Sequence, residues 1–477
     1  MDADSIYELD QEFRDSIKTV DKDGKRIWLN PKKPFNERYH KARIWVSVLL
    51  LGLLFGTPFI KIDGHPFMLF NIFERKFILF GVPFWPQDFH ILVLGAIAFI
   101  IFIVLFTVVF GRIWCGWACP QTIFMEMVFR KIEYWIEGDA SKQKKLNNSP
   151  WTTEKIIKKA SKQAIFVAIS LLIAHTLMAY LVGLDKTIEI VSMPPSANLS
   201  GFIALLAFTG VFYWVFSYFR EQACIAVCPY GRLQGVFLTK ESIAVMYDWV
   251  RGEKRAKIRK NQDREQLGFG DCIDCNLCVH VCPTGIDIRN GTQLECVNCT
   301  ACIDACDVVM RKTNKPEGLI RYASHDSIEK GKNKIFTARV KAYSVVLLLI
   351  LSLLGYLLAT RTDVETGFLR VPGMLYNKED NGNISNLYNV KFVNKTFDPI
   401  DLSLKVLNEP DAIIRRVGST GEGIHIDANA LEEGIFFVEL PPKSIKSIKT
   451  KLVIGVFENG KQIETVKTNF VGPVSGK

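Results

Sequence analysis

Eight cysteines between residues 272 and 306 limit most strongly what this chain can fold into. The first four form the run Cys272-x-x-Cys275-x-x-Cys278-x-x-x-Cys282-Pro283, and the same spacing recurs in Cys296, Cys299, Cys302 and Cys306. Three cysteines at x-x spacing followed by a fourth after x-x-x are typical of [4Fe–4S] cluster sites. Two complete copies in tandem therefore predict two clusters held in one small domain.

The fourth cysteine of each run is expected to serve the other cluster, as in ferredoxin-type domains. We therefore predict that one cluster is held by Cys272, Cys275, Cys278 and Cys306, and the other by Cys282, Cys296, Cys299 and Cys302. Two zinc sites or disulfides are the alternative, but zinc sites use well-separated pairs of Cys-x-x-Cys. Asp307 stands where a proline would follow Cys306, which affects only the local turn.

Five segments without Asp, Glu, Lys or Arg add a second constraint. They have 17 to 22 residues and cover residues 44–60, 89–110, 163–184, 198–219 and 342–360. A helix of this length crosses a hydrocarbon core of about 30 Å. We therefore expect five transmembrane helices.

The distribution of basic residues predicts the orientation of these helices. Ten Lys or Arg precede residue 44 and nine lie in residues 120–162, whereas the 185–197 segment has only Lys186. Under the positive-inside rule the N-terminus and the cluster domain face the cytoplasm, and the chain after Arg361 is periplasmic.

The basic residues flank apolar segments, which argues against nucleic-acid binding. All twelve cysteines fall within motifs, so a disulfide framework has little support.

The residues after about 364 change character. Apolar and polar side chains alternate in residues 388–392 and 400–406, as in half-buried strands, and further apolar runs occur at 437–440 and 452–457. The dipeptide Asn459-Gly460 is typical of a hairpin turn. We expect an immunoglobulin-like antiparallel β-sandwich without a disulfide. The predicted organisation is a multi-domain integral membrane protein with a cytoplasmic tail (1–43), a four-helix membrane domain (44–240), a cytoplasmic [4Fe–4S] ferredoxin-type domain (241–335), a fifth transmembrane helix (336–361) and a periplasmic Ig-like β domain (362–477).

A second pair of cysteine motifs accompanies the membrane helices. Trp114-Cys115-Gly116-Trp117-Ala118-Cys119-Pro120 follows the second apolar segment, and Ala223-Cys224-Ile225-Ala226-Val227-Cys228-Pro229 follows the fourth. The first four helices thus resemble a tandem repeat, which would bring the four cysteines together. Spacing of i, i+4 places each pair on one helical face. The proline suits the first position of a following helix, with Cys119 and Cys228 at its N-cap.

The chemistry at these four cysteines stays open from the residues alone. Four thiolates suit an iron–sulfur cluster or a soft ion such as Cu(I), and disulfide exchange or plain packing at a turn are alternatives. His175, in the third apolar segment, is expected to hydrogen-bond a neighbouring helix rather than bind haem or quinone.

In its motifs and their order, nearly the whole chain resembles the cytochrome c oxidase accessory proteins of the FixG/RdxA/CcoG type. The resemblance rests on the segment 110–122, Cys224–Tyr230, the double cysteine run, Gly318–Tyr322 and the β tail. It implies a bacterial inner-membrane polyferredoxin with an Ig-like tail. It further implies a role in assembling a cbb-type cytochrome oxidase by reducing Cu(II) to Cu(I).

We therefore hypothesise that electrons pass from a cytoplasmic donor through two [4Fe–4S] clusters to Cys115, Cys119, Cys224 and Cys228. Copper or a third cluster is expected there, and oxidase-assembly or copper-delivery proteins are the expected partners. One alternative is a quinol-linked carrier that serves a periplasmic respiratory reductase. The other is an assembly scaffold without enzymatic activity.

Overall fold

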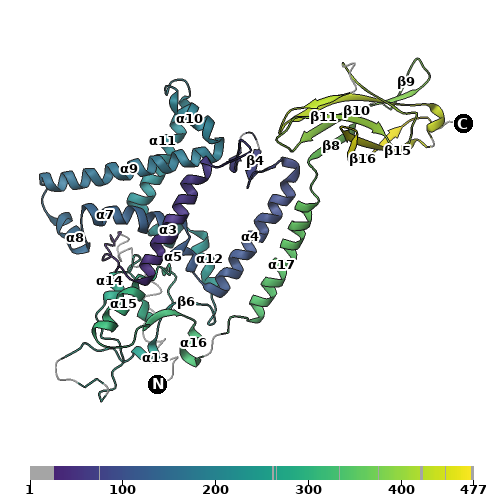
Figure 1. The fold of residues 1–477 in the computed structure, drawn as a ribbon. Coiled ribbons are helices and arrows are strands. Elements are labelled where there is room, and N and C mark those ends of the chain that lie inside the picture. The colour runs from purple at the N-terminus through teal and green to yellow at the C-terminus, as the bar shows by residue number, and fades with distance from the viewer. Residues whose placement is uncertain are drawn as a thin grey trace. The chain divides into compact units, whose positions relative to one another are not determined.

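The computed structural model divides the chain into two compact units. One comprises Met1–Ile60 and Leu94–Ser352, and the other comprises Lys61–Val93 and Leu353–Lys477 (Figure 1). The structure describes residues 26–473, apart from residues 73, 75, 260–262, 265, 332–333, 374, 419–422 and 446. Most of the predicted N-terminal tail, residues 1–25, lies outside the described residues.

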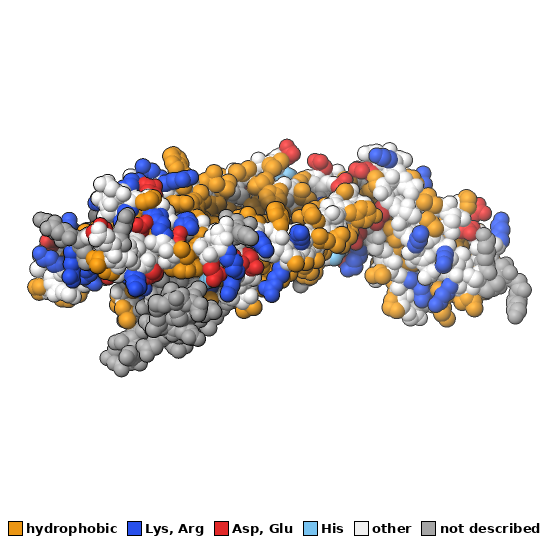
Figure 2. Space-filling view, turned by 90° about the horizontal axis from the view of Figure 1, so that it is seen from below, with side chains coloured by type: hydrophobic (Ala, Val, Ile, Leu, Met, Phe, Trp, Pro, Cys, Tyr) orange, Lys and Arg blue, Asp and Glu red, His pale blue; other side chains and the backbone are white. Residues whose placement is uncertain are grey.

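Five long apolar helices confirm the predicted spans. They are α3 (Arg38–Gly56), α4 (Phe89–Phe110), α9 (Thr153–Val182), α11 (Leu199–Trp214) and α17 (Ala338–Ala359). At most 28% of the residues in any of their most apolar windows are buried within the protein. Large side chains such as Trp45, Leu49, Ile100 and Leu349 are exposed, and Figure 2 shows broad hydrophobic areas. Such surfaces are stable only against lipid.

Helix α9 begins ten residues before the apolar segment that predicts it. Its N-cap, Thr152, accepts a hydrogen bond from the Lys155 backbone N–H, which satisfies an otherwise free donor of the first turn. The added turns carry Lys159 and Lys162, which form ion pairs with Glu137, each at 2.9 Å. The charged start of the helix is thus held by neighbouring acidic residues rather than by lipid.

Aromatic side chains form a core between these helices. Phe129 stacks on Phe216 with ring centroids 4.7 Å apart, and Phe166 meets Phe129 edge-on at the same distance. Phe129 and Phe216 belong to the π-helical segments η3 (Ile123–Phe129) and η4 (Val215–Phe219). These π-helical turns bring the segment after the first membrane cysteine motif into contact with the segment before the second. Shorter helices follow or connect them: α7 (Arg130–Ile136), α8 (Ala140–Asn148), α10 (Leu184–Ser192) and α12 (Pro229–Phe237).

The cysteine-rich domain is built mainly of loops, consistent with a fold organised around bound clusters. A two-stranded antiparallel sheet pairs β6 (Ala244–Tyr247) with β7 (Ile320–Ala323). The helical elements are α13 (Trp249–Gly252), α14 (Leu277–His280), η6 (Ile288–Asn290), α15 (Ala301–Lys312) and α16 (His325–Lys330). Buried Met310, Leu319 and Ile320 pack against Cys272 and Cys278, so the cysteines form part of the domain core.

The C-terminal strands form the predicted β-sandwich. One sheet has the order β12-β14-β10-β8, with β9 also paired to β10, and the other has the order β13-β11-β15-β16. Asn459 and Gly460 both have positive φ at the β15–β16 turn, as the hairpin prediction requires. The strands are β8 (Val364–Arg370), β9 (Asn377–Lys378), β10 (Ile384–Asn394), β11 (Ile400–Val406), β12 (Ile413–Arg416), β13 (Ile424–Ile426), β14 (Leu431–Leu440), β15 (Lys449–Glu458) and β16 (Lys461–Val471).

The segment Lys61–Val93 belongs to the same compact unit as this sandwich. Buried Asp88 accepts hydrogen bonds from Lys395 at 2.7 Å and from Arg361 at 3.0 Å. The ring of His65 stacks on Phe397 with centroids 3.9 Å apart. These contacts join residues more than 270 positions apart. The segment contains β1 (Lys61–Ile62), β2 (His65–Pro66), β3 (Met68–Asn71), β4 (Lys76–Leu79) and β5 (Val82–Phe84).

Candidate electron-transfer centre

The two cysteine runs fold into loops of the same backbone geometry. Asp274 and Asn276 in the first run have positive φ, and so do Asn298 and Thr300 at the equivalent positions of the second. The left-handed residues turn the backbone after each early cysteine. α14 and α15 then begin at Leu277 and Ala301 and carry the next cysteine of each run. The repeated spacing therefore produces two similar loop-to-helix turns.

These turns bring the cysteines together in two groups of four. The first site is a cavity lined by Cys272, Cys275, Cys278 and Cys306. The second site is a cavity lined by Cys282, Cys296, Cys299 and Cys302. In each group three cysteines come from one run and the fourth from the other, which is the grouping expected from the spacing. Cys278 lines both cavities, so the two sites adjoin.

The chemistry of both sites fits iron–sulfur clusters. The two cavities are similar in size, about 370 and 340 Å³ with the solvent-open space at their mouths included, as expected for two copies of one cofactor. Burial raises the pKa of Cys278 and Cys296 to about 12, so these thiols stay neutral unless a cation binds. Backbone N–H groups of Asn298 and Ala301 point at Cys296 and Cys299 and act in the opposite direction, stabilising thiolates. Hydrogen bonds to sulfur are characteristic of cluster sites.

The four-cysteine site consists of Cys115, Cys119, Cys224 and Cys228. Cys119 and Cys228 are the N-caps of α6 (Pro120–Thr122) and α12, each followed by proline at the first helical position, as predicted. The prediction that each pair lies on one continuous helix is wrong. α5 (Ile113–Trp117) ends before Cys119, and η5 (Ala223–Val227) ends before Cys228. The reason is the proline that follows each second cysteine, which favours extended backbone at that cysteine.

The four sulfurs lie close enough to influence one another. Burial, together with the charges of neighbouring cysteines of the group, raises the pKa of Cys115 to about 11 and that of Cys224 to about 12. Gln234 on α12 donates a hydrogen bond to Cys115 Sγ at 3.5 Å. The two motifs, more than one hundred residues apart, thus meet as the repeat predicts.

The four-cysteine site packs directly against the second site. Cys115 and Cys224 contact the small apolar cluster that contains Cys299, Val297 and Ala305. Gly116 approaches so closely that a Cβ atom there would lie 2.5 Å from the carbonyl oxygen of Asn298. The side chain of Trp117 also donates a hydrogen bond to Tyr322 Oη at 2.9 Å. The three sites therefore follow one another in space, from first to second to four-cysteine site.

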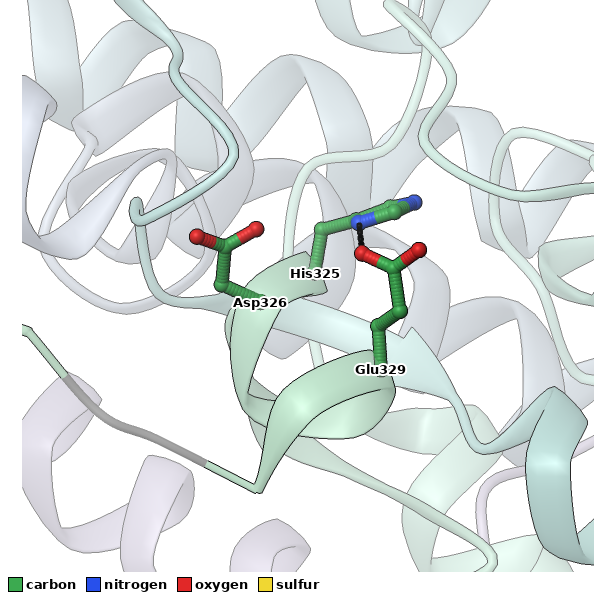
Figure 3. A group of neighbouring side chains, drawn as sticks. All are labelled: His325, Asp326 and Glu329. Carbon is green, nitrogen blue, oxygen red and sulfur yellow. Dashed lines mark ion pairs between the residues drawn. The ribbon is translucent and has the colours of Figure 1, made fainter. Parts of the chain in front are cut away.

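One further group of candidate metal ligands lies outside the cysteine sites. In the part of the chain that the structure describes, His325, Asp326 and Glu329 place three ligand atoms within 4.8 Å of one another. In the His325 group (Figure 3), Lys330 lies beside both carboxylates. We therefore interpret that group as a surface ion-pair network.

His175, singled out in the sequence, lies on α9, whereas His280 lies within the first cysteine run, between Cys278 and Cys282. His175 Nδ1 lies 2.8 Å from the carbonyl oxygen of Leu171. The expected contact with a neighbouring helix is therefore replaced by one within α9. His280 is exposed. Sequence reasoning missed Arg43, Gly116 and Gln234. Only Gly116, a glycine between two tryptophans in a cysteine motif, carried a local signal of close packing.

Comparison with known proteins agrees with this arrangement. A family model described as a 4Fe-4S dicluster domain matches residues 219–325, one described as a 4Fe-4S binding domain matches residues 92–142, and one for the IG-like fold at the C-terminus of FixG matches residues 354–473. Protein RdxA of Cereibacter sphaeroides is 33% identical over 408 residues, which cover 82% of this chain and 85% of RdxA. The chain belongs to the FixG/RdxA family. It is thus an iron–sulfur electron-transfer protein and a multi-pass membrane protein.

One further relative also matches most of the chain, and a solved structure matches a smaller part of it. Nitrogen fixation protein FixG of Rhizobium meliloti is 32% identical over 471 residues, with 87% of each chain covered. A crystal structure of a FixG-related protein from Vibrio parahaemolyticus matches 23% of this FixG/RdxA chain and 97% of its own, at 18% identity and a TM-score of 0.20.

Proposed function

We propose that this protein reduces Cu(II) to Cu(I) at the four-cysteine site, with electrons that enter at the first site and pass through the second. The carrying observation is the packing of Cys115 and Cys224 against the same apolar cluster as Cys299. Electron transfer needs such close approach between centres. The adjoining cavities that share Cys278 support the earlier step from first to second site.

The chemistry is a one-electron transfer. Bound [4Fe–4S] clusters supply electrons singly, and each Cu(II) that accepts one becomes Cu(I). Thiolate is a soft ligand that favours Cu(I) over Cu(II), so Cys115, Cys119, Cys224 and Cys228 would bind the product well. Burial raises the pKa of the Cys115 and Cys224 thiols, so binding of a copper ion releases protons from them.

The charge pattern supports a cytoplasmic location for this reaction. Arg112 and Arg130 flank the first membrane motif, and nine basic residues lie in residues 120–162, so the positive-inside rule puts both motifs and the cluster domain inside. The donor is then a cytoplasmic one-electron reductant. In keeping with the resemblance to oxidase accessory proteins, the Cu(I) would pass to copper-delivery or assembly proteins of a cbb-type cytochrome oxidase.

A specific observation favours a second candidate, a third cluster at the four-cysteine site. The match to a 4Fe-4S binding domain covers residues 92–142, where Cys115 and Cys119 are the only cysteines. With a third cluster the protein would be an electron carrier that hands electrons to a separate respiratory reductase.

Anaerobic analysis of the full-length protein tests both candidates. Iron and sulfide are counted in wild type and in a variant with Cys115, Cys119, Cys224 and Cys228 all changed to serine. Both samples are then photoreduced, freed of reductant and mixed with Cu(II) and a Cu(I)-selective chelator. About eight iron atoms in both proteins, with Cu(I) formed by wild type alone, supports copper reduction. About twelve in wild type and eight in the variant supports the third cluster.

A first-site variant, Cys275→Ser, is the matched control. It leaves the four-cysteine site intact and interrupts the supply of electrons to it. It is expected to contain less iron and to form less Cu(I) than wild type. Equal Cu(I) formation by wild type and the fourfold serine variant, at equal iron content, would exclude the four-cysteine site as the place of reduction.

A further inference from the structure

Two buried arginines beside the second site lack an acidic partner. Arg43 on α3 and Arg112 before α5 are each only 5% exposed. Within the described residues, neither forms an ion pair with an aspartate or glutamate, and both bond only to backbone carbonyl groups. A buried guanidinium without a counter-charge costs several kcal/mol. Both arginines lie next to cysteines, which indicates that the compensating negative charge is that of the cysteine thiolates and the cluster they would hold.

Arg43 joins the second site to the four-cysteine site. Its Nη1 donates to the carbonyl oxygen of Cys299 at 2.9 Å, and its Nε donates to that of Gly116 at 3.0 Å. One rigid guanidinium thus fixes a cysteine of the second site against the residue that follows Cys115. Its charge acts on the Cys299 thiolate and lowers the pKa that burial raises.

Arg112 makes a second link of the same kind. Its guanidinium donates to the carbonyl oxygens of Leu294 and Gly231, which lie before Cys296 and after Cys228 in the sequence. The positive charge of Arg112 lowers the pKa of both Cys296 and Cys115, against the larger effect of burial. Both arginines therefore favour negative charge at the second site and at its border with the four-cysteine site.

The first site has carboxylates paired with its cations. Arg289, whose side chain is 7% exposed, pairs with Asp274 at 2.7 Å and with Asp287 at 2.6 Å. Asp307 follows Cys306 directly and raises its pKa, while the partly buried Arg264 donates to the Cys272 carbonyl oxygen at 3.0 Å. At the second site Glu126 pairs with Arg130 at 2.6 Å. The two sites share their cysteine geometry but differ in surrounding charge.

We propose that Arg43 and Arg112 are positioning residues that hold the second cluster at a higher reduction potential than the first. A reduced cluster carries one more negative charge than an oxidised one, so nearby uncompensated cations stabilise reduction and nearby carboxylates oppose it. Electrons that enter the first site then collect at the second, beside the four-cysteine site. The inference rests on the two-cluster part of the proposed function and not on copper.

Redox titration of the full-length protein, followed by EPR, tests the proposal. Wild type should show two separate one-electron steps. Arg43→Gln and Arg112→Gln should each shift the higher-potential step to lower potential, at unchanged iron and sulfide content. Arg289→Gln should shift only the lower-potential step and so identifies the first cluster. Arg311→Gln is the control, since Arg311 is 48% exposed and paired with Glu37 on the surface. It should shift neither step.

Arg43→Lys separates charge from packing. Lysine keeps the positive charge but cannot reproduce both hydrogen bonds, so it should retain most of the wild-type potential even if the protein is less stable. Unchanged potentials in both glutamine variants with full iron content, or a shift of the lower step by Arg43→Gln, would overturn the proposal. Because no copper is added, a failure here is distinct from a failure of copper reduction.

Discussion

At the scale of single residues, a glycine of the first membrane motif lies directly against the cluster domain. A Cβ atom on Gly116 would lie 2.5 Å from the Asn298 carbonyl oxygen and 2.6 Å from that of Val297. These are backbone atoms, so the loop that carries Cys296 and Cys299 would have to move as a whole. The absence of a side chain at position 116 sets the distance between the second site and the four-cysteine site.

Gly116→Ala is therefore expected to destabilise the protein by about 1–3 kcal/mol, the usual cost of overpacking. It should also slow electron delivery to the four-cysteine site. Thermal unfolding of purified protein and the rate of Cu(I) formation after photoreduction measure the two effects. Gly210→Ala on α11 is the matched control, because nothing lies within 4 Å of a Cβ atom there. Wild-type stability and rate in Gly116→Ala would show that the contact is loose.

At the scale of secondary-structure elements, charge pairs connect α7, the start of α9 and the turn before the second membrane motif. Glu133 on α7 accepts a hydrogen bond from Arg220, next to the second membrane motif, at 3.1 Å, and pairs with Lys162 of α9 at 3.4 Å. All three side chains are at most 11% exposed. The ion pairs therefore fix α7 and α9 relative to the turn that positions Cys224.

Glu133→Gln is expected to lower the free energy of unfolding by about 3–5 kcal/mol, because it leaves the buried Arg220 guanidinium without its acidic partner. A lower thermal midpoint in detergent is the measured result. The control is Glu154→Gln, whose carboxylate is 71% exposed and pairs only with Lys158 one turn along α9. That change should leave the thermal midpoint close to that of wild type, because an exposed pair within one helix contributes little to stability. Equal midpoints for the two variants would contradict the structural role of Glu133.

Element boundaries show where sequence reasoning succeeded and where it could not. Spacing and hydropathy are local properties, so they located the five spans, the two cysteine groups and the Asn459-Gly460 hairpin. The break between Cys115 and Cys119 depends on Pro120, and its effect on the preceding cysteine was overlooked in favour of the i, i+4 rule. Arg43 contacts Cys299 across 256 positions. A local sequence pattern cannot predict which carbonyl group a distant arginine will contact.

At the scale of the whole molecule, the charge pattern predicts which parts face each side of the membrane. Protease added to intact spheroplasts should remove the strands after Arg361 and leave residues 241–331 protected until the membrane is lysed. The positive-inside rule gives the reason, since basic residues flank the inner ends of the spans. Immunoblotting with antibodies to each domain follows the two fragments. Protection of the C-terminal strands before lysis would reverse the orientation.

The hydrophobic cores are separate, which predicts how the molecule responds to loss of iron. The sandwich core, with Tyr388, Phe392 and Leu452, contains no cysteine, whereas the cores of the cluster domain include Cys272, Cys278 and Cys299. Removing iron would leave buried thiols around two empty cavities and release the loops that they hold. The described strands of the sandwich would keep their packing.

Hydrogen exchange measured by mass spectrometry, before and after anaerobic treatment with a chelator and an oxidant, tests this difference. Amide protection should fall in residues 266–331 and stay unchanged in residues 384–394 and 449–458. Protection should also fall around Gly116, because its partners Val297 and Asn298 belong to the released loop. Cys275→Ser, which disturbs only the first site, should reproduce the loss around that site and spare the Gly116 contact. Uniform loss of protection in both compact units would show that their folding is coupled.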